Sequence, residues 1–124
     1  MAKWIGVDLD GTLAKSVSTM TGGIGEPVPS MLTKVKDWLQ RGQPVRIFTA
    51  RAGDPKQVRA IRAWLRQHDI DKCGITDRKD LDMIELWDDK ARRVEKDTGK
   101  VCSGCRPKPS NHSSLDGAVV FTDC

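Results

Sequence analysis

Short apolar runs alternate with segments of helical periodicity over most of the chain, and this alternation constrains the fold more than any other feature. The runs Trp4–Leu9, Pro44–Phe48, Gly74–Thr76 and Met83–Trp87 have the length of buried strands. Strands that alternate with helices predict an α/β fold, with a mostly parallel sheet and helices on both faces. Ligands of such sheets bind at the carboxyl ends of the strands, where the strand order reverses.

Two segments between these runs have the pattern of amphipathic helices. The first is closed by Arg41-Gly42, and its apolar positions are Met31, Leu32, Val35, Trp38 and Leu39. The second opens with Asp54 as an N-cap and Pro55 in the first turn, and its inward positions are Val58, Ile61, Trp64 and Leu65. Residues 14–29 are rich in Ser, Thr, Gly and Pro and predict an irregular loop.

The length of 124 residues argues for a single domain. We expect a core over residues 1–98 and a polar, turn-rich tail over 99–124, in which 118–121 either adds an edge strand or dangles. No stretch approaches the roughly 20 apolar residues of a membrane helix. The first apolar run carries two acids and does not resemble a signal peptide, so we expect a cytoplasmic protein without a membrane partner.

The net charge of +4 conceals an uneven distribution of charges. Residues 31–66 carry nine Lys/Arg against two Asp, and residues 69–89 carry eight acids against three bases. These blocks fit an acidic pocket flanked by basic surface, which would handle phosphates or nucleic acid through a cation. Solvated helix faces with a basic tail explain them equally well.

Pairs of acids follow the first and the last apolar run. Asp8 and Asp10 are two residues apart, so on a strand their side chains leave by the same face, and a cation is needed to offset their repulsion. Carboxylate oxygens of this kind suit Mg²⁺, and Asp88-Asp89 could supply a further ligand. Gly11 permits a tight turn whose backbone N–H groups can cradle a phosphate.

Four motifs in order resemble the haloacid dehalogenase-like (HAD-like) phosphatases over residues 3–95. They are Asp8-Leu9-Asp10-Gly11-Thr12-Leu13, Phe48-Thr49-Ala50-Arg51, Lys79 in Thr76-Asp77-Arg78-Lys79, and Trp87-Asp88-Asp89. The resemblance implies a single-domain Rossmann-like fold and a Mg²⁺-dependent phosphohydrolase that forms an aspartyl-phosphate.

The resemblance also implies a role for each motif residue. Asp8 would be the nucleophile and Asp10 the general acid and base, while Thr49 holds the phosphoryl oxygens and Lys79 offsets their charge. Arg78 and Lys90 are alternative cations. The implied metal residues are Asp8, Asp10 (through its main-chain carbonyl), Asp88 and, through a supporting role, Asp89. The implied substrate-binding residues are Leu9, Gly11, Thr12, Ala50 and Arg51, although a solvated or structural arginine is an equal alternative at position 51.

The segments between the motifs are too short for the cap domain that many members of this superfamily carry. An open site admits bulky phosphate esters such as nucleotides or nucleic-acid ends, unless an oligomeric partner covers it. Arg59, Arg62 and Arg66 share a helix face that is compatible with nucleic acid, although a solvated stripe is the simpler interpretation.

Other functions remain open at this stage. A phosphotransferase would pass the phosphoryl group to an alcohol, and a non-catalytic protein would only bind phosphate or nucleic acid. Cys102 and Cys105 could form half of a zinc site, with Cys73, His112 or Cys124 completing it, but free thiols are the simpler interpretation.

Overall fold

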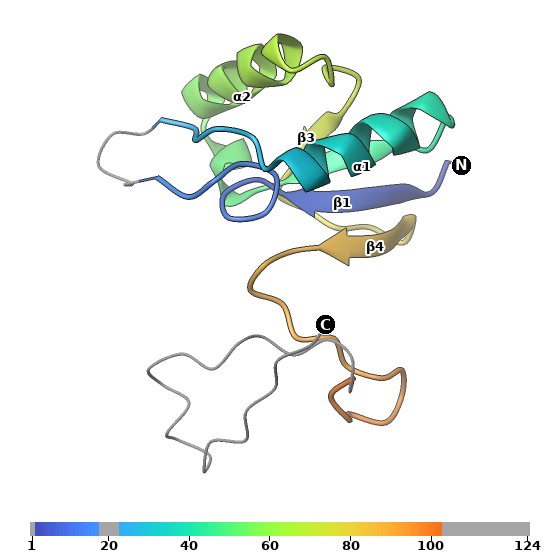
Figure 1. Ribbon diagram of the computed structural model, residues 1–124. Helices are drawn as coiled ribbons and strands as arrows, with labels where there is room; N and C mark the ends of the chain where they lie inside the picture. Colours follow the sequence, from blue (N-terminus) through green and yellow to red (C-terminus); the bar gives the residue numbers. More distant parts are fainter. Residues whose placement is uncertain (1, 18–22, 103–124) are drawn as a thin grey trace. The chain divides into compact units, whose positions relative to one another are not determined.

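The computed structural model describes residues 2–17 and 23–102. It has an α/β fold whose sheet is entirely parallel, with the strand order β3-β2-β1-β4 (Figure 1). The elements are β1 (Trp4–Asp8), α1 (Pro29–Gln40), β2 (Val45–Phe48), the 3₁₀ turn η1 (Ala50–Gly53), α2 (Pro55–Gln67), β3 (Gly74–Thr76) and β4 (Met83–Trp87). The predicted α/β class, the four strands and the two helices are therefore confirmed.

Strand β1 lies between β2 and β4 and is paired along both of its edges. Ile5 to Asp8 pair in register with Val45 to Phe48 of β2. On the other edge the register with β4 shifts between Trp4 and Ile5. The chain moves from β1 to β2 and β3 on one side and then returns to the other side for β4, so the strand order reverses between β1 and β4.

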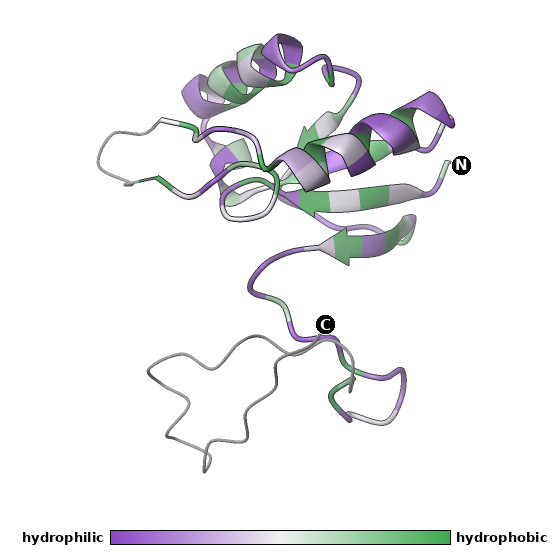
Figure 2. Cartoon of the chain, in the orientation of Figure 1, coloured by the Kyte–Doolittle hydropathy of each residue, from purple (hydrophilic) through white to green (hydrophobic). Residues whose placement is uncertain are grey.

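Both helices pack on the same face of the sheet. Ile5 and Val7 point to this face, because alternate residues of a strand share a face, and they form one core cluster with Val35 of α1 and with Ile61 and Leu65 of α2. Figure 2 shows polar residues recurring along both helices, as expected for helices that bury only one side. The prediction of helices on both faces is wrong for the described residues. The reason is that both crossovers, β1–α1–β2 and β2–α2–β3, run in the same direction and have the same hand.

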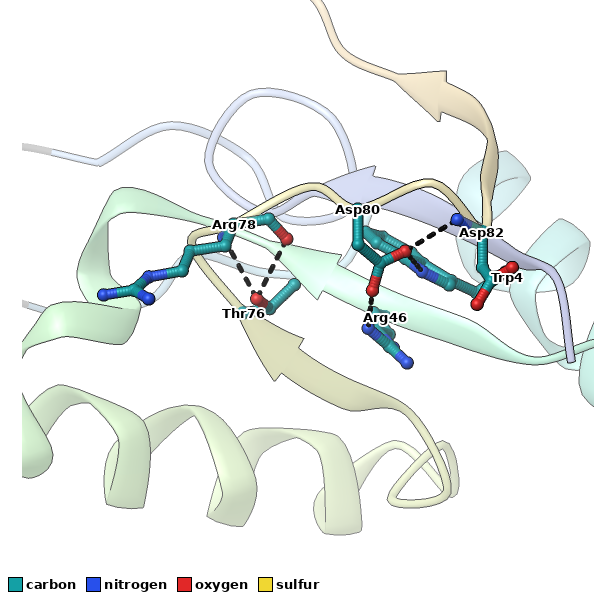
Figure 3. Close-up of polar contacts among 6 residues, drawn as sticks. All are labelled: Trp4, Arg46, Thr76, Arg78, Asp80 and Asp82. Carbon is teal, nitrogen blue, oxygen red and sulfur yellow. Dashed lines mark hydrogen bonds and ion pairs between the residues drawn. The ribbon is translucent and has the colours of Figure 1, made fainter. Parts of the chain in front are cut away.

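The opposite face of the sheet is crossed by residues 77–82, the connection from β3 to β4. The Trp4 indole N–H donates to Asp80 Oδ1 at 2.9 Å, and the Asp82 backbone N–H donates to the same oxygen (Figure 3). Arg46 lies 4.5 Å from the centre of the Trp4 ring and pairs with Asp80 Oδ2 at 3.3 Å. The indole hydrogen bond and then the Asp82 N–H hold the pKa of Asp80 below its ordinary value.

Helix α2 begins as its sequence predicts. The Asp54 side chain accepts a hydrogen bond from the Lys56 N–H at 3.0 Å, and Pro55 follows directly in the first turn. Arg62 donates to the main-chain oxygens of Asp71 and Cys73, both at 2.8 Å. The middle residue of the predicted arginine stripe therefore ties α2 to the approach to β3.

The described residues between β1 and α1 form no helix or regular strand, as predicted, and they are fixed by hydrogen bonds. Ala14 forms an isolated bridge with Pro27, and the Lys15 N–H donates to the Glu26 carbonyl at 2.8 Å. The Trp64 indole of α2 donates to the Gly25 carbonyl at 3.1 Å. Gly25 packs so closely on the Lys15 carbonyl that a Cβ would overlap it.

The chain divides into two compact units, one ending at Asp88 and the other beginning at Asp89. In the second unit, Val94 and Val101 form an isolated antiparallel bridge, and the Glu95 N–H donates to the Lys100 carbonyl at 2.7 Å. The possible edge strand at 118–121 lies outside the described residues, as does most of the predicted tail. Among the described residues, no helix is both long and apolar enough to cross a membrane.

We predict that Gly25→Ala lowers the free energy of unfolding by about 1–3 kcal/mol, because the added methyl group forces the Gly25 and Lys15 backbones apart. Urea denaturation measures the change. Gly53→Ala is the matched control, because a Cβ there meets its nearest atom at an ordinary 3.6 Å. Equal stability of Gly25→Ala and the wild type would contradict the packing of this loop.

We also predict that Asp80 makes stability depend on pH in the acid range. Its folded pKa lies below the ordinary value of 3.8, so its contribution is present above that value and is lost as the pH falls through the folded pKa. Asp80→Asn should therefore be less stable than the wild type near neutral pH, and the gap should shrink in acid. Denaturant titrations at several pH values test this, with the exposed Asp71→Asn as control; a gap independent of pH would contradict it.

Candidate functional site

Three of the predicted site residues lie at the carboxyl ends of three adjacent strands. Asp8 is the last residue of β1, Thr49 follows β2, and Asp88 follows β4. Because β1 and β4 flank the reversal in strand order, Asp8 and Asp88 lie on either side of the position where parallel sheets bind ligands.

Three carboxylates come together there. One oxygen from each of Asp8, Asp88 and Asp89 lies within 4.8 Å of the others. Opposite ligands of an octahedral Mg²⁺ are roughly 4.2 Å apart at its usual bond lengths, so small side-chain movements would bring these oxygens into range. The donor set is all oxygen, which suits a hard divalent cation, although exposed acids also cluster without a metal. The predicted contribution of the Asp10 carbonyl stays a prediction.

The turn after β1 is closed by its own hydrogen bonds. Gly11 has a φ of 91°, which favours glycine, and its N–H donates to the Ala14 carbonyl at 2.8 Å. The Thr12 hydroxyl donates to Asp8 Oδ2 at 3.3 Å and so orients the predicted nucleophile. Leu9 is fully buried in the core, which leaves only its main chain available to a substrate.

Arg51 forms a two-point ion pair with Asp10. Its Nε donates to Asp10 Oδ2 at 2.9 Å and its Nη2 donates to Oδ1 at 2.7 Å. The same Nη2 also donates to the Gly23 carbonyl at 3.0 Å. The sequence places Arg51 with the substrate but gives no sign of this pair, because the two residues are 41 positions apart.

Thr49 lies at the start of η1 and is 4% exposed. Its N–H donates to the Thr76 carbonyl of β3, and its hydroxyl oxygen accepts the Arg51 N–H at 3.2 Å. Within residues 2–17 and 23–102, no acceptor takes the proton of this hydroxyl, which is therefore available to a ligand. Ala50, the next residue, is exposed.

Lys79 is exposed on the connection between β3 and β4, and the described residues give it no hydrogen bond or ion pair. The next residue, Asp80, is hydrogen-bonded to Trp4 at the start of β1. Asp8 of the acidic cluster lies at the other end of the same strand. The structure therefore does not join Lys79 to the acidic cluster, and its role stays a prediction. Arg78, an alternative cation, lies 3.9 Å from the Asp77 carboxylate in an exposed pair.

A cavity of about 350 Å³ lies elsewhere, lined by Lys36, Leu39, Gln40, Asp69, Asp71 and Lys72. Three of these residues lie at the end of α1, which leads into the amino end of β2. The other three lie in the connection from α2 to the amino end of β3. The cavity is thus at the opposite edge of the sheet from the acidic cluster.

Cys73 is a poor candidate to complete the predicted zinc site. Cys73 is a core residue, and burial raises the pKa of its thiol to about 12, which disfavours the thiolate that binds metal. Cys105, His112 and Cys124 lie outside the described residues.

Comparisons with family models, curated proteins and solved structures find no match to this chain. The motif resemblance and the geometry of the site are therefore the grounds for a functional proposal.

If the acidic cluster binds a divalent cation, Asp88→Asn should weaken Mg²⁺ binding by at least about tenfold, because it removes a charged oxygen ligand. Isothermal titration calorimetry with Mg²⁺ measures the affinity. Asp71→Asn removes an acid outside the cluster and should bind Mg²⁺ like the wild type. Equal affinity in all three proteins would exclude Asp88 as a ligand.

Proposed function

We propose that this protein is a Mg²⁺-dependent phosphohydrolase of the HAD-like type, which cleaves a phosphate monoester through an aspartyl-phosphate. The observation that carries the proposal is the meeting of Asp8 with Asp88 at the reversal in strand order. The first and fourth motifs of the resemblance thus come together in space, although 80 positions separate them in the chain.

In the first step, an Asp8 carboxylate oxygen attacks phosphorus and the bond from phosphorus to the ester oxygen breaks. Asp10 enters this step protonated and gives its proton to the departing oxygen, which leaves as an alcohol, so that Asp10 becomes the carboxylate that pairs with Arg51. The Thr12 hydroxyl donates a hydrogen bond to Asp8 Oδ2 and so fixes the orientation of the nucleophilic carboxylate.

In the second step, water attacks the phosphorus of the aspartyl-phosphate while Asp10 takes a proton from the water. The bond between phosphorus and the Asp8 oxygen breaks, and the products are inorganic phosphate and the free carboxylate. Thr49 donates its hydroxyl proton to a phosphoryl oxygen, and Lys79 is the proposed cation that offsets the phosphoryl charge.

Asp8 and Asp88 would hold Mg²⁺, with Asp89 supporting the site. When bound, the metal shields the anionic nucleophile from the anionic substrate. Without this shielding, the carboxylates repel one another and the phosphate.

The proposed substrate class is a bulky phosphate ester, such as a nucleotide or a nucleic-acid end. Between β2 and β4 the chain is occupied by η1, α2, β3 and their connections, which supports a capless domain with an open site. At this edge Asp8 and Asp10 are partly exposed. Thr49 is buried and is followed by the exposed Ala50.

The test is the release of inorganic phosphate from para-nitrophenyl phosphate, followed by nucleotides and phosphorylated oligonucleotide ends. We expect turnover that requires Mg²⁺, stops with a chelator and falls by at least about a thousandfold in Asp8→Asn, because the amide cannot act as the nucleophile. Asp71→Asn should retain activity.

A folded, Mg²⁺-loaded wild type that releases no phosphate from any of these substrates would exclude the hydrolase and leave a binding protein. Phosphate transfer to an added alcohol, in place of release, would identify a phosphotransferase.

A further inference from the structure

The carboxylate of Asp10 is held differently from that of Asp8. Both of its oxygens accept from the Arg51 guanidinium, at 2.7 and 2.9 Å, in the two-point geometry that only arginine provides. The Arg51 side chain is 15% exposed and that of Asp10 is 36% exposed, so the pair is partly shielded from water. A shielded two-point pair fixes the plane of a carboxylate far better than an exposed single contact.

Arg51 is itself held from three directions. Its backbone N–H donates to the Thr49 hydroxyl oxygen, at the start of η1. Its Nη2 donates to the Gly23 carbonyl, in the loop that precedes α1. Its carbonyl accepts the Asp54 N–H at 3.1 Å, just before α2. The Arg51 backbone is therefore fixed at the end of β2, and its guanidinium reaches across to Asp10 in the turn after β1 and to the Gly23 carbonyl.

We propose that Arg51 is the positioning residue of Asp10: the guanidinium aims the Asp10 carboxyl at the oxygen of the leaving group. This inference rests on the proposed function and adds to it a residue that acts through Asp10. This inference departs from the substrate contact that the sequence offers as one of two roles for Arg51. Two of its donor groups, Nε and Nη2, are already committed to Asp10 and Gly23.

The two roles have different chemical consequences. A residue that positions the acid matters most when the leaving oxygen needs a proton, and little when the leaving group departs easily as an anion. A residue that binds the phosphoryl group matters equally for every ester, because that group is common to all of them.

The experiment compares kcat/KM for para-nitrophenyl phosphate, which has a good leaving group, with kcat/KM for phenyl phosphate, which has a poor one. This ratio reports the formation of the aspartyl-phosphate, the step in which the leaving group departs. The proteins are the wild type, Arg51→Gln, Arg51→Lys and the control Arg59→Gln, which removes an exposed arginine of α2.

We expect Arg51→Gln to lose about 10- to 100-fold on phenyl phosphate and about threefold or less on para-nitrophenyl phosphate. Arg51→Lys should behave like Arg51→Gln, because an ammonium keeps the charge but not the two-point geometry. Arg59→Gln should match the wild type on both substrates. Asp10→Asn should show the same dependence on the leaving group, and adding Arg51→Gln to it should cost little more.

Equal losses on both substrates, largely restored by lysine, would overturn the proposal in favour of a phosphate contact. Unfolding of both Arg51 variants, seen by circular dichroism, would overturn it in favour of a purely structural role. A wild type inactive on both esters and on the wider substrate set would refute the proposed function, and this inference with it. An active wild type with uniform Arg51 losses refutes the inference alone.

Discussion

Strand β1 is paired on both edges, and its burial fixes the positions of the helices and of the acidic residues. β2 and β4 flank this strand, and its apolar residues Ile5 and Val7 lie in the core beneath both helices. A strand buried in this way cannot tolerate charges along its length, so its acids emerge only where the strand ends. Since neighbouring parallel strands end at the same edge, the burial of β1 also brings Asp8 close to Asp88.

The structure gives the two acids of the first motif different surroundings. Asp8 is near other carboxylates and accepts the Thr12 hydroxyl, whereas Asp10 is held by a guanidinium. Two carboxylates with different neighbours are suited to two different chemical tasks, because the environment decides how each one orients and what it approaches. The proposed division between nucleophile and proton carrier has this physical basis.

The face of the sheet without helices depends on a different set of contacts. Residues 77–82 cross it as an irregular connection with a turn at its end, fixed by the Trp4–Asp80 hydrogen bond and by Arg46 (Figure 3). These contacts also determine the path of the segment that carries Lys79. The sequence does not predict these contacts, because the periodicity of this segment is neither that of a helix nor that of a strand.

The prediction of helices on both faces failed for a related reason. Periodicity identifies a helix, but it does not say which face of the sheet the helix covers.

Local sequence patterns were enough to identify the strands and helices and the residues at their ends. The apolar runs placed the four strands to within a residue or so, Asp54-Pro55 placed the start of α2, and the order of the motifs placed Asp8, Thr49 and Asp88 at carboxyl ends. These are local properties, set by hydrophobic period and by capping chemistry. The three-dimensional fold was needed to show which strand ends are neighbours, that Arg51 reaches Asp10, and that Arg62 is bonded to the main chain before β3. Such contacts join residues distant in the chain, and they depend on strand order and crossover direction, which hydrophobic patterning does not encode.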